Sequence, residues 1–497
     1  MHRQSRSHRP AITLAAAGAL GLIATGIAQA GPVTGSGVPI DTVQPSVGVT
    51  YLVRTQDPTN FADIGQVEAF GGSVIPGGFS VANGQLVSIA SNPALFSRIG
   101  NTYGGDGVTN FALPNLSGRT VVGFGQGAGL TNRNLGSATG ATAQTLTPNQ
   151  VPPFGGASGI LSASQPVSIL QPSLALAQAV VTQGFFPSPN GAPAQGPVIG
   201  QVLTYASPLI PNGRQFANGQ QLPINQNQAL FSVVGNTYGG NGFTSFALPN
   251  LSGRAATEAG AGPGLTPEAL GTIMGAEATT LNVANLPPQP LRKPDGTTAI
   301  FGGNQPFSVQ QPTLGLRYII ATQGVFPTAG TILPDGAPFL GEISLFAGNI
   351  APAGWQFADG QMVSINTDPA LFAILGTTFG GNGFTTFGLP DLRDRVAVGT
   401  GNGVLLGERF GHDTDTLNFA QLPVGYPAAL PAVPEPPALA ILLTALLGLV
   451  CARRGTARAS SAAVQHWSIQ RWGASAGVEP TSRTNGCGST PMSSTIA

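Results

Sequence analysis

Charged side chains are scarce in this sequence. Only 8% of its 497 residues are charged, Lys+Arg and Asp+Glu balance at 20 each, and Lys293 is the one lysine. Proteins that bind nucleic acid need a patch of basic side chains to neutralise phosphate groups. A neutral chain of this composition offers no such patch, and we expect no nucleic-acid partner.

Cysteine is almost absent. Cys451 and Cys487 are the two cysteines, and both lie at or beyond an apolar stretch near the C-terminus. The residues before that stretch therefore have no disulfide to stabilise them. Glycine (71) and proline (43) are abundant, but a hydrophobic content of 42% with recurrent Leu and Phe is enough to bury cores. Stability must come from packing and from backbone pairing.

One stretch of the chain is written three times. The copies begin at Gly65, Gly200 and Gly341, and each contains [Asn/Asp]-Gly-Gln, then Ala-Leu-Phe, then [Tyr/Phe]-Gly-Gly-[Asn/Asp]-Gly, then Phe-x-Leu-Pro-[Asn/Asp]-Leu. A long-period repeat of this kind indicates a folding unit that is used several times. Three units are therefore expected.

Each copy predicts the same local structure. In the first, a strand at 67–70 leads to a hairpin turn at Asn83-Gly84, because Asn-Gly supplies the positive φ of two-residue turns. A helix of about two turns follows, with Asn92 as its cap and Gly100 as its left-handed stop. The second and third copies repeat these signals.

A second repeated element lies ahead of each copy. The segments 44–56, 171–183 and 311–323 share a Gln-Pro-[Ser/Thr] start, alternating apolar residues and a final Thr-Gln. This pattern predicts one long strand in each. The repeating unit is thus a strand plus the copied stretch, and the linkers after the first two copies, including 287–303, are expected to be loose.

The glycine loops, which are the Gly-Gly-[Asn/Asp]-Gly stretches at 104–107, 239–242 and 380–383, resemble a phosphate cradle in composition only. A nucleotide loop opens directly into a helix and carries a Lys in its P-loop form, whereas these loops continue into an extended segment. Asp106, Asn241 and Asn382 are interpreted as residues that tolerate the turn.

Histidine is the remaining catalytic candidate. Between the terminal processing signals described below the only one is His412, and with Glu408, Asp413 and Asp415 it has the side chains of a metal site or of a general base. The other two copies lack a matching histidine, which favours a polar turn before a strand at 416–419. We expect no catalytic residue, no metal and no cofactor.

The copied motifs resemble the phage tail collar domain, which also occurs in bacterial proteins called microcystin-dependent. The resemblance covers about 65 residues per copy and implies a structural or binding role in α+β modules of mainly β character. Relatives often continue with Leu-Pro-x-His-x-His, a metal-holding pair, but the chain has Phe154, Gln289 and Gly425 at the corresponding places. Metal-mediated trimerisation is therefore not expected.

Arginines recur after the last motif of each copy, at Arg119, Arg254 and Arg393 or Arg395. Two interpretations stay open. They pair with nearby Asp and Asn positions, which we favour, or they contact an anionic ligand at the surface.

Residues 1–30 have the three parts of an export signal. Three arginines precede an apolar stretch at 11–27, and Ala30 ends a small-x-small cleavage site. A membrane anchor at the N-terminus is the alternative. Cleavage is favoured because the apolar stretch is short and built largely of Ala and Gly.

The C-terminal part resembles a PEP-CTERM sorting signal. Its Val-Pro-Glu-Pro motif is followed by an apolar stretch at 438–450, shorter than the roughly 20 residues of a stable span, and by two arginines. The motif residues are Pro434, Glu435, Pro436, Arg453 and Arg454. The resemblance implies transient anchoring in the inner membrane of a Gram-negative bacterium, cleavage by an exosortase-like protease, and release to the cell surface or extracellular matrix. An ordinary anchor is the alternative.

The domain boundaries follow from these patterns. They are a signal peptide at 1–30, repeat 1 at 41–152 (collar 65–130), repeat 2 at 165–288 (collar 200–265), repeat 3 at 305–423 (collar 341–407), a sorting segment at 433–454 and a tail at 455–497. The tail departs from the PEP-CTERM pattern and is either disordered or the product of a shifted stop.

The sequence therefore predicts a mainly β protein with short helices that is exported and is not an enzyme. The expected partners are a polysaccharide or another surface ligand, and the chain itself. The three collars form either an intramolecular pseudo-trimer or a string of separate beads. An enzyme or metal-dependent module acting on extracellular polysaccharide is the alternative function, with His412 as its discriminating residue.

Overall fold

The computed structural model describes residues 38–57, 63–152, 167–292, 298–330, 332 and 337–423. All of them belong to the larger of two compact parts of the chain, Met1–Pro431. The smaller part, Ala432–Ala497, lies outside the described residues. The predicted signal peptide and sorting segment also lie outside them. Within the described ranges, we find no helix with the length and apolar character needed to cross a membrane.

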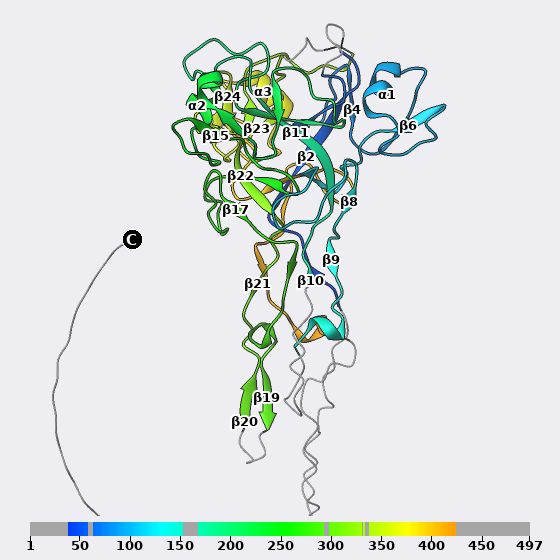
Figure 1. Cartoon of the computed structure of the whole chain (residues 1–497), viewed down its shortest axis with the longest axis vertical. Coiled ribbons are helices and arrows are strands. Elements are labelled where there is room, and N and C mark those ends of the chain that lie inside the picture. Colours follow the sequence, from blue (N-terminus) through cyan, green and yellow to red (C-terminus); the bar gives the residue numbers. More distant parts are fainter. Residues whose placement is uncertain are drawn as a thin grey trace, which may run out of the picture. The chain divides into compact units, whose positions relative to one another are not determined.

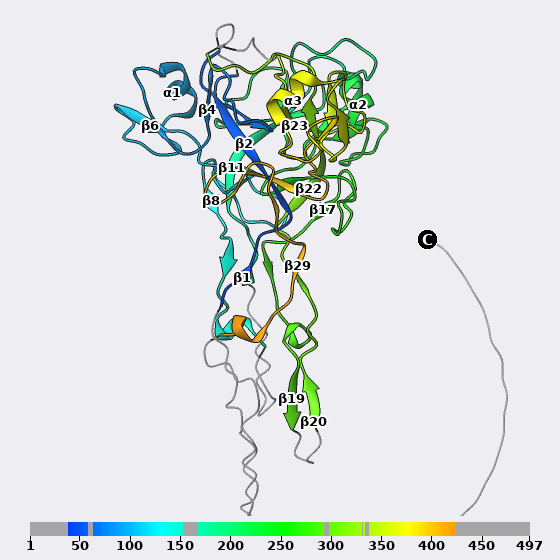
Figure 2. The same cartoon turned by 180° about the vertical axis from the view of Figure 1, so that it is seen from behind.

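Three long strands form the framework, one ahead of each collar (Figures 1 and 2). They are β2 (Ser46–Arg54), β11 (Ser173–Val181) and β22 (Thr313–Ala321). The long strands predicted from the alternating pattern are confirmed. Nearly every residue along them is buried, because other strands pair with them on both edges.

The first part of each collar folds back on its own long strand. An antiparallel strand pairs with the second half of the long strand, and a shorter one covers its end. The former are β3 (Gln66–Phe70), β12 (Gln201–Tyr205) and β23 (Glu342–Phe346). The latter are β4 (Phe79–Val81), β13 (Arg214–Phe216) and β24 (Trp355–Phe357).

The last strand of each collar pairs with the next unit. These closing strands are β7 (Thr120–Gly123), β16 (Ala255–Glu258) and β27 (Val396–Gly399). They run parallel to β11, β22 and β2 respectively, and β27 thereby returns from the third unit to the first. Parallel pairing requires a long connection. The segment after the closing strand supplies it for β7 and β16, whereas β27 pairs with a strand about 350 residues earlier in the chain.

The strands β3, β12 and β23 also pair with one another. The end of each meets the start of another, in the pairs Phe70–Glu342, Phe346–Gln201 and Tyr205–Gln66. The hydroxyl of Tyr103 donates to the carbonyl of Ala206 in the second unit (2.6 Å), and that of Tyr238 to Ala347 in the third (2.7 Å). Each unit thus hydrogen-bonds to its neighbour through backbone and side chain.

The three units share one hydrophobic core. A single contiguous cluster includes side chains from all three long strands and all three helices. Examples are Val49, Leu176 and Leu316 from the strands, and Leu95, Leu230 and Leu371 from the helices. Apolar contact across the units therefore adds to the strand pairing that joins them.

Three short helices lie on the collars. They are α1 (Pro93–Ile99), α2 (Gln228–Val234) and α3 (Pro369–Leu375). Each ends at a glycine with positive φ (57° at Gly100), as predicted. The predicted capping by the Asn92 side chain is wrong, since its amide donates back to the carbonyl of Ser88 (3.1 Å). With helices this short, the prediction of a mainly β fold is confirmed.

The hairpin predicted at Asn83-Gly84 is wrong. Gly84 has the expected positive φ of 79°, but Asn83 does not, and the flanking strands pair with other partners. The strand before the turn pairs with β2, and the strand after it pairs with β6, because tertiary partners are available to both. The peripheral hairpins are β5 (Leu86–Ser88) with β6 (Asn110–Ala112), β14 (Gln221–Pro223) with β15 (Ser245–Ala247), and β25 (Met362–Ser364) with β26 (Thr386–Gly388).

A smaller core lies beside the main one. Short pairs connect the residues ahead of each long strand to those after its own collar, around a cluster that includes Ile40, Val167 and Phe307. The pairs are β1 (Ile40–Asp41) with β9 (Ala143–Gln144), β10 (Val167–Ser168) with β18 (Ala278–Thr279), and β21 (Phe307–Ser308) with β29 (Thr414–Asp415). Figure 2 shows β1 and β29 in this region.

The remaining elements are short. Part of the 287–303 linker, expected to be loose, forms the hairpin of β19 (Gln289–Arg292) with β20 (Thr298–Phe301). The strand predicted at 416–419 is also wrong, since β29 ends at Asp415 and a 3-10 turn follows. The others are β8 (Ala138–Thr139), β17 (Ile273–Met274), β28 (Arg409–Phe410), η1 (Pro148–Gln150), η2 (Ile224–Gln226), η3 (Val283–Asn285) and η4 (Phe419–Gln421).

Candidate functional site

The predicted arginines lie where one unit meets the next. Each closing strand, together with the loop that follows it, lies against a turn of the next unit. That turn comes just before the next unit's own closing strand. We call this place of contact a joint. Arg254 lies at the joint of the first and second units, Arg395 at that of the second and third, and Arg119 at that of the third and first. Arg393 is two residues before Arg395.

Arg254 serves its joint. The side chain is buried, and its Nη1 donates to the carbonyl of Ser252 (3.3 Å). The loop of the first unit lies over it so closely that a Cβ added at Gly127 would come within 2.7 Å of Nη1. Burial lowers the pKa of this guanidinium, because the charged form loses hydration. A residue enclosed in this way has a structural role.

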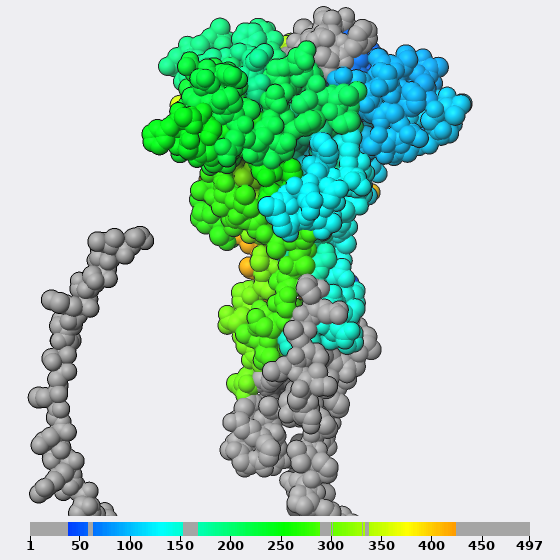
Figure 3. All heavy atoms as spheres, viewed as in Figure 1, coloured from blue at the N-terminus to red at the C-terminus, as the bar shows by residue number. Residues whose placement is uncertain are grey.

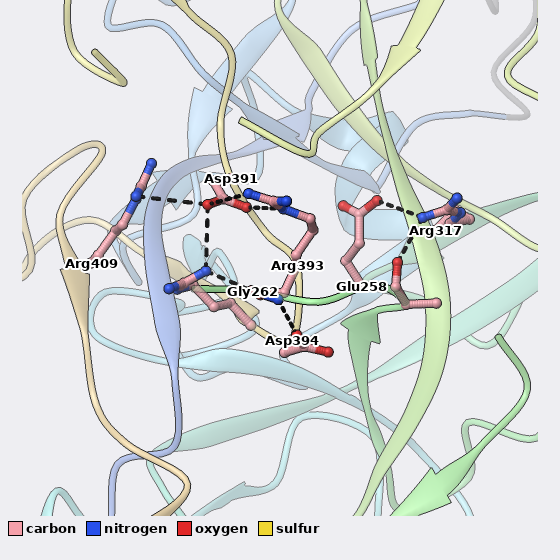
Figure 4. Close-up of polar contacts among 9 residues, drawn as sticks. Glu258, Gly262, Arg317, Asp391, Arg393, Asp394 and Arg409 are labelled. Atoms are coloured by element: carbon pink, nitrogen blue, oxygen red, sulfur yellow. Dashed lines mark hydrogen bonds and ion pairs between the residues drawn. The ribbon is translucent and has the colours of Figure 1, made fainter. Parts of the chain in front are cut away.

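Arg393 and Arg395 gather around the carboxylate of Asp391, and Figure 4 shows Arg393 against it. Arg393 forms a two-pronged pair with Asp391 (Nε–Oδ1 2.8 Å, Nη2–Oδ2 3.2 Å), which is the geometry that a guanidinium and a carboxylate prefer. Arg395 and Arg409 approach the Oδ2 atom of the same residue, each at 3.7 Å. Here the structure brings the two predicted arginines together, with an aspartate as their partner.

Asp394 joins the same cluster to the preceding unit. It has a φ of 56°, whereas Gly118 and Gly253 occupy the matching places of the other collars with φ of 68° and 70°. The carboxylate accepts hydrogen bonds from the backbone N–H of Gly262 and of Glu268 (2.8 Å to the latter). These bonds offset the strain of a left-handed non-glycine residue.

Two glutamates of the second unit complete this joint. Glu258 is fully buried and faces Arg317 at 3.7 Å (Figure 4), and burial raises its pKa well above the usual range. Glu268 accepts a hydrogen bond from the Thr257 hydroxyl, yet burial raises its pKa to about 7. The other joints have Gly123 and Gly399 in place of Glu258, so this cluster is specific to one joint.

Arg119 has different surroundings. It is half-buried, its Nη1 donates weakly to the carbonyl of Asn115 (3.3 Å), and it lines a cavity of about 430 Å³. The cavity lies at the joint of the third and first units, and its lining includes Phe410 and Asn402 from the third and Gln171 from the second. Sequence reasoning gave the four arginines the same two interpretations; the structure separates Arg119 from the rest.

Three apolar loop tips form a second candidate site, which sequence reasoning missed. Val108, Phe243 and Phe384 follow the glycine loops at equivalent places, and they are 80%, 90% and 89% exposed. In the second unit, the side chain of Asn241 accepts from three backbone N–H groups, those of Phe243 and the next two residues (2.8–3.0 Å). The Asn and Asp predicted to tolerate the turn therefore fix its shape.

The loop tips project from the collar lobes. Figure 3 shows one such lobe, drawn in blue, formed by the first unit beside the green surface of the second. In the first loop, hydrogen bonds from backbone N–H groups and from the Thr109 hydroxyl hold the pKa of Asp106 well below its usual range. A rigid loop that presents an apolar side chain to solvent suits a contact with a partner. The recurrence of a large apolar residue after Gly-Gly-[Asn/Asp]-Gly was the available sequence signal.

The histidine segment shows no metal site in the structure. His412 Nδ1 lies 3.9 Å from a carboxylate oxygen of Asp41, and both side chains are partly exposed. Asp413 accepts from the backbone N–H of Thr266 (2.8 Å), so it serves the joint of the second and third units. Across the described residues, no group of three or more His, Cys, Asp or Glu side chains is placed to hold a metal ion.

The remaining predicted site residues cannot be placed. They are Ala30, Pro434, Glu435, Pro436, Arg453 and Arg454, and all lie outside the described residues.

The fold and these sites define a repeat-built, mainly β protein whose charged clusters serve the contacts between units. The family model of the Phage Tail Collar Domain matches residues 65–121, 200–256 and 341–397. The three predicted collar copies are thereby confirmed. Collar domains are structural fibre domains, and their presence indicates a phage tail-like structural or fibre protein. Comparisons with curated proteins and with solved structures gave no match.

Proposed function

We propose that this chain is an exported, non-enzymatic attachment protein that binds its target through the three loop tips. The observation that carries the proposal is the near-complete exposure of Val108, Phe243 and Phe384 at equivalent places. Single exposed apolar residues are common and need no explanation. Three at matching positions, on loops held by side-chain hydrogen bonds, are expected of a repeated contact surface.

The closed arrangement of the units supports this proposal. Because β27 pairs with β2, the third unit is joined to the first, and the three loop tips are carried by one covalent chain. Linked contacts reinforce one another when their target is itself repetitive, since the second and third contacts form at a high effective concentration. A polysaccharide or a cell surface offers such repetition, and neither requires a reactive side chain.

The test is adhesion of the purified full-length chain to host cells and to isolated surface polysaccharide. The double variant Phe243→Ser with Phe384→Ser is expected to lower adhesion about tenfold or more, because exposed aromatic anchors dominate such contacts. The matched control replaces two other exposed phenylalanines, Phe186→Ser with Phe326→Ser, which each follow a long strand and lie away from the loop tips in the sequence. Equal adhesion of both double variants would refute a role for the loop tips.

We also propose export and C-terminal sorting, which are supported by the cleavage-site pattern ending at Ala30 and by the Pro434-Glu435-Pro436 motif. The chain would then be held briefly at the inner membrane, cut by an exosortase-like protease and released to the surface. Mass spectrometry of both termini in fractions of the native host tests this. An intact N-terminus in a cytoplasmic fraction would refute it.

A further inference from the structure

The loops that close the three joints differ in length. Each is pinched by a backbone bridge, Gly125–Arg133 in the first unit, Gly260–Glu268 in the second and Gly401–Val404 in the third. Seven residues lie between the bridged positions in the first two loops, and only two in the third. The loop that covers the turn of the first unit is therefore five residues shorter than its counterparts.

The length of each loop determines how closely it covers the arginine beneath it. Gly262 lies over Arg395 as Gly127 lies over Arg254, with a hypothetical Cβ only 3.1 Å from its Nη1. At the third joint, a Cβ at Gly403 would meet nothing within 4 Å. Asn402 of the short loop reaches the carbonyl of Ser117 (2.8 Å), and a cavity of about 430 Å³ beside Arg119 is lined by Asn402 and Val404 of this loop.

The cavity is electropositive by composition. Of the residues that line it, Arg119 is the one charged side chain, and no Asp or Glu is among them. The Arg119 guanidinium makes a 3.3 Å hydrogen bond to the neutral carbonyl of Asn115, so most of its donors are available. A guanidinium with free donors binds carboxylates in a planar, two-pronged way.

A buried amide lies in the wall of the same cavity. Gln171 lines it, is 1% exposed, and its Nε2 has no hydrogen-bond partner. The Oε1 atom of the same side chain accepts from the Ser46 hydroxyl (3.5 Å), which orients the amide. Gln44 and Gln311, its counterparts, also have an unpartnered Nε2, but neither lines this cavity. In all three glutamines the unpaired Nε2 is closed off from solvent, so the donors that this cavity offers to a charged ligand are those of Arg119.

The rest of the lining suits a sugar ring. Phe410 and Val398 give an apolar wall, whereas Ser117, Thr139 and Asn402 give hydroxyl and amide groups. A mixture of apolar surface and a few placed polar groups is typical of small-molecule sites, and the volume lies in their range. The apolar wall suits the ring of a sugar, and the polar groups suit its hydroxyls. Arg119 suits a negative charge on the same molecule.

We propose that the cavity at the joint of the third and first units binds an acidic sugar of the uronic acid type, with its carboxylate on Arg119. The site is separate from the loop tips. The proposed site adds a sugar-binding step to the proposed attachment function. It rests on that function only in naming a surface polysaccharide as the source of the sugar. Binding of the free sugar in solution does not depend on adhesion.

The test is calorimetric titration of the purified full-length chain with glucuronate, with methyl glucoside and inorganic phosphate as comparison probes. Glucuronate is expected to bind, and the neutral sugar to bind at least tenfold more weakly, because it lacks the charge-assisted hydrogen bonds. Arg119→Gln should weaken glucuronate binding about 10- to 100-fold. Arg409→Gln removes an exposed arginine outside the cavity, and it should leave the affinity unchanged.

A second variant keeps the test decisive if Arg119→Gln fails to fold. Replacing residues 402–403 by the seven residues 261–267 of the second unit should fill the cavity and abolish binding. The grafted loop already closes the joint of the second and third units, so the graft uses a loop that suits a joint of this fold. Four results would overturn the proposal: no glucuronate binding by the native chain, unchanged binding in the loop graft, equal binding of methyl glucoside, or tighter binding of phosphate. Loss of adhesion in the loop-tip variants with intact glucuronate binding separates the two proposals.

Discussion

Replacing one buried glutamate should change how the stability of this chain depends on pH. Glu268 lies in the loop that closes the joint of the second and third units, and it faces Thr257, Asp394 and Asp413. Burial raises its pKa from an ordinary value of 4.5 to about 7, and the two aspartates contribute in the same direction. The folded chain therefore holds a proton that the unfolded chain releases.

The sign and size of the effect follow from this shift. Below pH 4.5 the glutamate is protonated in both states and costs nothing. Between pH 4.5 and 7 the unfolded chain loses the proton first, so the free energy of unfolding falls as the pH rises. A pKa raised from 4.5 to about 7, at about 1.4 kcal/mol per pH unit, corresponds to about 3 kcal/mol, all of it lost above pH 7.

The substitution Glu268→Gln removes this dependence. The amide oxygen still accepts from the Thr257 hydroxyl, and no charge forms at any pH. We expect the variant to match the native chain near pH 4.5 and to exceed it by up to about 3 kcal/mol at pH 8. Denaturant unfolding followed by the fluorescence of the buried Trp355 measures this difference at each pH.

The control is Glu408→Gln, which removes an exposed carboxylate of the same type. Its stability profile should run parallel to that of the native chain. If the Glu268→Gln and native profiles also run parallel between pH 4.5 and 7, the reasoning is refuted, because the native chain then holds no extra proton at this joint.

Substitutions at three further positions test the contacts between and within the units by the same unfolding measurement. Tyr238→Phe removes the 2.7 Å bond to the carbonyl of Ala347 and should cost about 1 kcal/mol; no measurable loss would show that the bond does not stabilise the contact. Asp394→Ala should lower the free energy of unfolding by about 3 kcal/mol, and Asp394→Gly by less. Both variants lose the hydrogen bond from Gly262, but glycine tolerates the positive φ and alanine does not. The reverse order would contradict the strain argument. Phe387→Ala empties a fully buried site and should cost about 3–5 kcal/mol, and a loss below 1 kcal/mol would contradict its place in the core.

Much of the local structure was predictable. The strand at 313–321 follows from its alternating and β-branched residues, and the stop of the first helix follows from Gly100. Local signals failed where a distant partner competed for the same backbone. Asn83-Gly84 is a strong hairpin signal, yet β4 pairs with β2 because a buried strand gains more there than in a two-stranded hairpin.

The candidate sites were less predictable for a related reason. The same motif places Arg119 and Arg254 at matching positions, and nothing adjacent in sequence distinguishes them. Their surroundings come from the loop of the preceding unit, and for Arg119 that loop lies almost three hundred residues further along the chain. The shortening of this loop is visible in the sequence, but its effect on Arg119 is visible only once β27 is known to pair with β2.

By itself, the sequence determined that one strand-plus-collar unit is used three times, since the repeated apolar pattern and glycines specify the same local structure in each copy. Only the tertiary structure decided which unit each closing strand would join. The parallel partner of a closing strand is distant in sequence. It is determined by the burial of the whole strand in the folded chain, and not by the residues of the strand alone. That choice placed one arginine beside an open cavity and buried its two counterparts.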